Sequence, residues 1–171
     1  MAGIAPLKSY IVPAVTKHTA TVIFVHGLGD TGLGWKPVAE MLNDELPQVK
    51  WVLPNAPPMP VTANGERKLA GLTVLSGWLP LRHDFKSMIS EHAKSLPIFW
   101  GHGSADPLVR HELAVKSVDF LRESIGINTS PTAEQLVGLS FTSYAGVQHS
   151  VNDRELSDLK TWLKKVLPSV D

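Results

Sequence analysis

Short apolar runs alternate along this chain with segments of helical spacing, and that alternation constrains its fold more than any other feature. Each run is rich in β-branched residues and is bounded by Gly, Pro or Asn, a composition typical of strands that are buried on both faces. The runs cover residues 21–25, 49–53, 72–75, 97–100 and 139–144.

Between these runs, apolar residues recur at helical spacing in three segments, residues 35–46, 114–125 and 156–166. Gly126 is a stop signal for the second segment, and Asn152 with Glu155 forms a capping arrangement ahead of the third. A weaker helix is expected around Phe85–His92. Strands that alternate with helices predict a mostly parallel sheet with helices on both faces, and the 171 residues fit a single domain over 1–171.

Composition excludes several classes of function. The 16 basic and 16 acidic residues give a formal net charge of zero, so we expect no nucleic-acid partner. The absence of cysteine removes disulfides, thiolate metal sites and a cysteine nucleophile. No apolar run is long enough for a signal peptide or a membrane span, which predicts a cytoplasmic protein without stable membrane insertion.

Two polar residues occupy the loops after the last two predicted strands. Asp106 follows the strand at 97–100, and His149 follows the strand at 139–144. Parallel sheets bind ligands at the carboxyl ends of their strands, and serine hydrolases of α/β type carry their acid and histidine on such loops in that order. Each residue alone is an ordinary loop residue, but together they predict the acid and the base of a catalytic triad.

The third member of a triad is missing. A nucleophile of this class is a serine in G-x-S-x-G at a sharp strand-to-helix turn, and that pattern occurs nowhere in the chain. Ser76 ends a predicted strand, but Gly-Trp-Leu-Pro follows it and cannot promptly start a helix. We interpret Ser76 as structural and keep it only as a minor alternative nucleophile.

A glycine-rich loop at residues 26–32, with the sequence HGLGDTG, follows the first predicted strand. Backbone N–H groups in such a loop can stabilise an oxyanion, although a tight turn that needs positive φ is an equal alternative. A phosphate-binding loop is less consistent with the spacing, since the pattern GxxxxGK[ST] is absent. The histidines form no metal-binding motif, so we expect no metal.

The connector between the second and third predicted strands is anomalous. Residues 54–71 must carry the chain between two parallel strands, a connection usually made by a helix. They contain no apolar helical stripe.

Five motifs occur together in the chain: HGLGDTG, PNAPPMPVT, LSGWLP, HGSADPLV and GVQHS. In this combination the sequence closely resembles the acyl-protein thioesterases, or lysophospholipase-like carboxylesterases, and most of all their fungal members. The resemblance implies an α/β-hydrolase fold without cofactor or metal, located in the cytoplasm and, by family, also in the nucleus. Its implied substrates are S-palmitoylated proteins and lysophospholipid-like esters.

The resemblance assigns roles residue by residue. Asp106 matches the family's triad acid, His149 matches its histidine, and Leu28 matches the residue whose backbone N–H is one oxyanion donor. It also implies that a central strand–helix unit carrying the nucleophile in GFSQGG belongs between Gly65 and Glu66, which are directly joined here. We therefore expect a hydrolase by kinship that is inactive; the alternative is a non-catalytic protein that binds acyl chains or lipidated proteins.

Overall fold

The structure is a computed structural model that describes residues 8–26, 31–55, 69–79, 85–86, 89, 93–94, 96–129 and 138–167. Its contacts divide the chain into two compact units, Met1–Thr62 with Pro168–Asp171, and Ala63–Leu167. Each unit is described by itself below, and the single domain over 1–171 stays a prediction.

The first unit contains β1 (Ser9–Val12), β2 (Ala20–Ile23), α1 (Gly32–Asn43) and β3 (Val49–Pro54). Its sheet has the order β1-β3-β2, in which β2 runs parallel and β1 antiparallel to β3. Sequence analysis did not predict β1, because its four residues are alternately exposed and lie outside the strand–helix alternation.

The core of the first unit forms around Trp51 on β3, which is almost completely buried. Its indole N–H donates to Asn43 Oδ1 at 3.2 Å, and the amide of Asn43 in turn donates to Pro13 O at 3.1 Å. Gly32 allows α1 to start against β3, since a Cβ at that position would lie 2.4 Å from Leu53 O.

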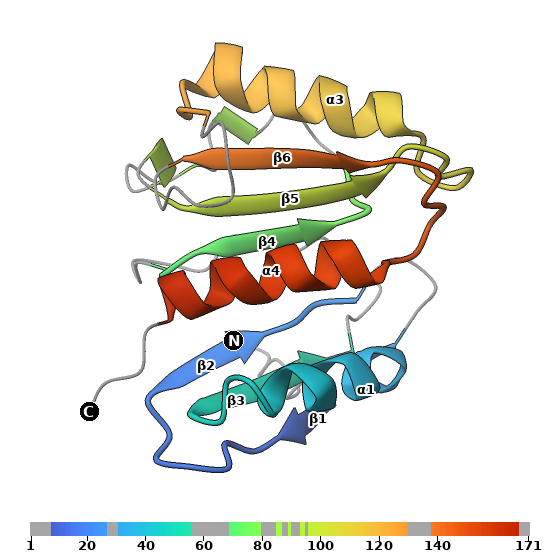
Figure 1. The fold of residues 1–171 in the computed structure, drawn as a ribbon. Coiled ribbons are helices and arrows are strands. Elements are labelled where there is room, and N and C mark those ends of the chain that lie inside the picture. The colour runs from blue at the N-terminus through green and yellow to red at the C-terminus, as the bar shows by residue number, and fades with distance from the viewer. Residues whose placement is uncertain are drawn as a thin grey trace, which may run out of the picture. The chain divides into compact units, whose positions relative to one another are not determined.

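The second unit contains β4 (Leu72–Leu75), β5 (Ile98–Gly103), α3 (His111–Phe120), a π-helical turn η2 (Leu121–Ile125), β6 (Leu139–Tyr144) and α4 (Asp153–Val166). Its three strands are parallel and lie in the order β4-β5-β6 (Figure 1). The predicted parallel sheet is thus present in this unit.

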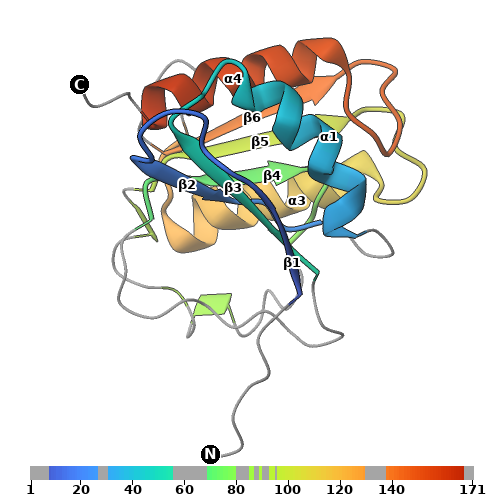
Figure 2. The same ribbon diagram turned by 90° about the horizontal axis from the view of Figure 1, so that it is seen from below.

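Two helices cover opposite faces of the β4-β5-β6 sheet (Figure 2). On one face, Trp100 of β5 packs in a cluster with Ala114 and Val118 of α3. On the other face, Phe99 of β5 lies against Trp162 of α4, with ring centroids 6.0 Å apart. Successive side chains of β5 therefore pack alternately against α3 and α4, as expected for a parallel sheet.

The helix ends agree with the signals in the sequence. Asn152 Oδ1 accepts a hydrogen bond from Glu155 N–H at 2.9 Å, which confirms the cap of α4. Gly126 adopts φ 79° at the end of η2, the left-handed conformation that favours glycine. The weak helix expected at Phe85–His92 lies mostly outside the described residues, of which Phe85 and Lys86 are helical.

The prediction that every apolar run is buried on both faces was wrong for β2 and for β4, which contain no fully buried residue and are edge strands among the described strands. All six residues of β5 are buried, whereas no residue of β4 is, and Leu72 is 41% exposed. The physical reason is position, because among the described strands β4 pairs with β5 alone and therefore forms an edge.

No helix in the described part of the chain is long and apolar enough to cross a membrane.

Candidate active site

Asp106 lies just past the carboxyl end of β5, and its side chain is fully buried. One carboxylate oxygen, Oδ1, accepts hydrogen bonds at 2.9 Å from the N–H groups of Leu108 and Val109. These two bonds hold the carboxylate plane fixed and leave Oδ2 available for a side-chain donor.

That donor is His149, in the loop after β6. Its Nδ1 lies 2.8 Å from Asp106 Oδ2, so the two residues selected from the sequence meet across 43 positions of the chain. With the carboxylate ionised, Nδ1 carries the proton and Nε2 is left as a basic nitrogen. The imidazole is 31% exposed, and no described residue is bonded to Nε2.

The two loops are held together by their backbones. Ser104 N–H donates to Tyr144 O at 2.9 Å, Ala105 N–H donates to Val147 O at 3.0 Å, and Gly146 N–H donates to Ser104 Oγ at 3.0 Å. Gly103 makes this approach possible, since a Cβ there would lie 2.2 Å from Val147 O. The glycine in HGSAD thus has a steric role in bringing His149 to Asp106.

The electrostatics of Asp106 follow from these contacts. Burial by itself favours the neutral carboxyl and raises its pKa. The hydrogen bond from His149, the two backbone N–H bonds and the charge of His149 together outweigh burial, so the pKa of Asp106 lies below its ordinary value of 3.8. Asp106 is therefore an anion at neutral pH, as the orienting acid of a triad must be.

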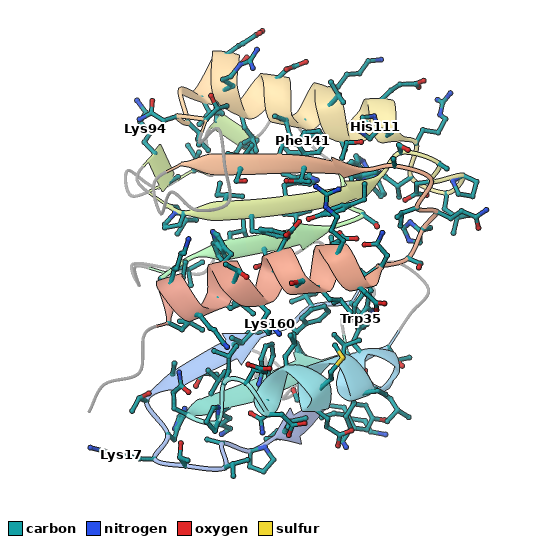
Figure 3. The ribbon with its side chains drawn as sticks, viewed as in Figure 1. Lys17, Trp35, Lys94, His111, Phe141 and Lys160 are labelled. Atoms are coloured by element: carbon teal, nitrogen blue, oxygen red, sulfur yellow. The ribbon has the colours of Figure 1, made fainter. Side chains whose placement is uncertain are left out.

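Sequence reasoning missed His102, whose ring lies beside the carboxylate of Asp106. Its Nε2 donates to Val109 O at 2.8 Å and lies 3.5 Å from Asp106 Oδ2, and the ring is completely buried. His102 also packs edge-on against His111, which lies beside Phe141 (Figure 3). The histidine in GHG is a local signal that could have been considered, but a buried histidine in a strand is usually structural.

A hollow of about 550 Å³ lies beside His149. Residues from both loops line it, among them Leu108 from the Asp106 loop and Val147 and Val151 from the His149 loop. Leu108 is 74% exposed. His149 therefore lies next to a partly apolar surface.

The structure does not bring Ser76 into this arrangement. Ser76 follows β4 with φ 52°, the one positive φ of a non-glycine residue among the described positions. Its hydroxyl is buried and has no hydrogen-bond partner, so it is not bonded to His149. Leu28 and the junction of Gly65 with Glu66 lie outside the described residues, and Leu28 as an oxyanion donor stays a prediction.

A second buried carboxylate lies against the opposite face of β5. Glu155, in the first turn of α4, is completely buried, and neither carboxylate oxygen has a hydrogen-bond partner among the described residues. Its Oε1 lies over Gly101, where a Cβ would come within 2.2 Å of it. Burial, with a smaller contribution from Asp158, raises the pKa of Glu155 to about 7.

Within the described part of the chain, no three acidic or histidine side chains gather to form a metal site.

With this geometry established, comparison with known proteins identifies the family. The model of the phospholipase/carboxylesterase family matches residues 7–69 and 65–167 of this chain. The chain belongs to the phospholipase/carboxylesterase family. This is a family of serine hydrolases.

Relatives within this family are similar along nearly the whole chain. Acyl-protein thioesterase 1 of Cryptococcus neoformans is 34% identical over 233 positions, which cover 94% of this chain and 98% of the relative. Acyl-protein thioesterase 1 of Neurospora crassa is 30% identical over 246 positions, which cover 99% of this chain and 96% of the relative.

Solved structures give the fold of this family member. Zea mays acyl-protein thioesterase 2 superposes with a TM-score of 0.75 at 21% identity and covers 95% of this chain and 100% of its own. Arabidopsis thaliana SOBER1 gives a TM-score of 0.68 at 24% identity, covering 88% and 99% respectively. The predicted α/β-hydrolase fold is confirmed.

The same comparisons show that the family pattern is interrupted here. The two matched segments of the family model meet at residues 65–69, around the junction that sequence analysis singled out. The alignment with the Cryptococcus relative has 233 positions, so at least 62 of them have no counterpart among the 171 residues of this chain.

Proposed function

We propose that this chain carries the acid and the base of an acyl-protein thioesterase site without the nucleophile. Asp106 is the orienting acid, and His149 is the general base. The observation that supports this proposal is the 2.8 Å bond between His149 Nδ1 and Asp106 Oδ2, with Oδ1 fixed by two backbone donors. The family membership gives this arrangement a chemical context.

In a complete site, His149 Nε2 takes the proton of a serine hydroxyl while the oxygen attacks the carbonyl carbon of a thioester or ester. Asp106 stabilises the imidazolium, and the Leu28 N–H is one donor to the oxyanion. The imidazolium then protonates the leaving group, and water releases the acid from the acyl-enzyme. No step in this sequence uses a metal or cofactor.

The proposed substrate class is taken from the relatives, which are named acyl-protein thioesterases. We assign S-acylated proteins, with lysophospholipid-like carboxylic esters as further substrates of the complete site. In this chain, no serine lies in G-x-S-x-G, and the covalent route is closed. A missing triad member typically costs several orders of magnitude in rate, so turnover is negligible.

Hydrolysis of a palmitoyl-cysteine peptide and of a nitrophenyl ester tests this proposal. The purified chain is compared with the intact Cryptococcus relative, after a cooperative melt has shown that the chain is folded. We expect a rate indistinguishable from the His149→Ala variant. Hydrolysis at the rate of the relative, lost in His149→Ala, would contradict the absence of a nucleophile.

The hollow beside His149 supports a second candidate function, which is binding of an acyl chain without chemistry. Leu108, Val147 and Val151 line this hollow together with His149. Binding of a fluorescent fatty-acyl probe, weakened in Leu108→Asp and unaccompanied by turnover, is the expected result for that function. Equal probe binding by both proteins would eliminate this hollow as its site.

A further inference from the structure

The outer edge of β4 presents backbone groups that are ready to pair. Leu72 N–H donates to Pro97 O and Ser76 N–H donates to Gly101 O, each at 2.9 Å. In a parallel ladder alternate residues bond the same neighbour, so the N–H and C=O of Thr73 and Leu75 point to the opposite side. No described strand is hydrogen-bonded to β4 on that side.

The side chains along this edge are more apolar than an exposed edge requires. Leu69, Leu72 and Trp78, which precede, begin and follow β4, are each 41–44% exposed. The sequence Leu-Thr-Val-Leu carries no charge, no proline and no bulge, the devices by which edge strands usually avoid pairing. The composition is that of a central strand with one neighbour missing.

The comparison with the family indicates which part of the chain lacks the strand that would pair with the outer edge of β4. At least 62 aligned positions of the Cryptococcus relative have no counterpart here, and the two matched segments meet at residues 65–69, immediately before β4. That length exceeds the roughly 30 residues of a strand–helix unit.

We propose that the outer edge of β4 is an acceptor for one parallel β-strand supplied by another polypeptide, namely the family segment that has no counterpart in this chain. Main-chain hydrogen bonds to Thr73 and Leu75 provide the affinity, and Leu72 and Trp78 are covered by the apolar side chains of the incoming unit. This inference rests on the proposed function for its consequence, since the same segment would bring a serine to His149.

The test uses the full chain and a recombinant peptide that comprises the segment of the Cryptococcus relative without a counterpart here, taken where the two family-matched segments meet at residues 65–69. Amide hydrogen exchange is followed by NMR with and without a saturating amount of peptide. We expect exchange at Thr73 and Leu75 to slow by at least about ten-fold, because their N–H groups become bonded. Exchange at Leu72 and Val74, which already bond β5, changes little. A scrambled peptide gives no protection.

A matched pair of variants tests the edge itself. Thr73→Pro removes an N–H that points away from β5, so the β4–β5 ladder remains while pairing at the outer edge is blocked. Protection of Leu75 by the peptide is lost in Thr73→Pro and kept in Thr73→Val. If Thr73→Pro does not fold, the exchange result on the unmodified chain decides by itself.

Three outcomes would overturn the acceptor role. One is no protection at Thr73 and Leu75 with the peptide, and another is equal protection by the scrambled peptide. The third is protection that grows with the concentration of the chain alone, which would make a second copy the occupant. Ester hydrolysis by the mixture is a separate readout: protection without hydrolysis leaves the acceptor intact and contradicts the catalytic roles of His149 and Asp106.

Discussion

Two buried carboxylates lie at the same end of β5, and they differ in every contact. Asp106 accepts hydrogen bonds from His149 and from two backbone N–H groups, and its pKa is below the ordinary value. Glu155 is completely buried without a partner, and its pKa is raised to about 7. All the hydrogen bonds that Asp106 needs as an anion are formed here, while the carboxylate of Glu155 has no hydrogen-bond partner among the described residues.

The largest expected effect is on the free energy of unfolding, and it comes from substituting two glycines of β5 whose surroundings differ. A Cβ at Gly103 meets the backbone oxygen of Val147 at 2.2 Å, so Gly103→Ala must displace the His149 loop. A Cβ at Gly101 meets Oε1 of Glu155, the end of a side chain that can move. In urea unfolding we expect a loss of about 3 kcal/mol for Gly103→Ala and about 1 kcal/mol for Gly101→Ala. Equal losses would show that the two sides of β5 are not packed differently.

Asp106→Asn removes the charge that holds His149 and two backbone donors. We expect a loss of about 2–3 kcal/mol in the free energy of unfolding at pH 7. Because the folded pKa lies below 3.8, this stabilisation is present above that pH and is lost as the pH falls through the folded value. Asp119→Asn, at an exposed position of α3, is the control and should change stability little. A loss that persists unchanged at pH 2 would mean that charge is not its cause.

Glu155→Gln is expected to raise the free energy of unfolding, whereas Asp106→Asn lowers it. The folded state holds the Glu155 proton more tightly than the unfolded chain, so its cost to stability is absent below pH 4.5, grows as the pH rises toward 7 and is complete above it. We expect the variant to be about 2 kcal/mol more stable at pH 8, since a full shift to pKa 7 is worth roughly 3 kcal/mol and the buried amide retains part of the cost.

The measurement is urea unfolding of both proteins at pH 8 and pH 4.5, with Glu112→Gln on the exposed side of α3 as the matched control. The gain in stability of Glu155→Gln over wild type should be lost at pH 4.5. A gain of the same size at both pH values, or a loss at pH 8, would contradict an unsatisfied ionised carboxylate at this position.

Much of the fold could be predicted because the signals are local. The apolar runs located β2 to β6, and the cap of α4 and the stop at Gly126 followed from residue type. Asp106 and His149 were found because strand order fixes which loops meet. The short strand β1 has no comparable signal, since its pairing with β3 is set by tertiary contact.

Other features depend on contacts that no local pattern records. Whether a strand of central composition becomes an edge depends on which neighbours it finds, and β4 finds only β5 among the described strands. The bond of His102 to Val109 and the isolation of Glu155 are likewise set by packing across elements. The anomalous connector at 54–71 and the absence of G-x-S-x-G were the signs in the residues themselves that a neighbour was missing.

The central claim is that this chain has the acid and the base of a serine hydrolase without a nucleophile. The most direct measurement is intact-mass spectrometry of the folded chain after incubation with a fluorophosphonate, with the intact Cryptococcus relative as the positive control. The account predicts no adduct on this chain and one on the relative. A single adduct that maps to Ser76, and that is lost in Ser76→Ala, would contradict it.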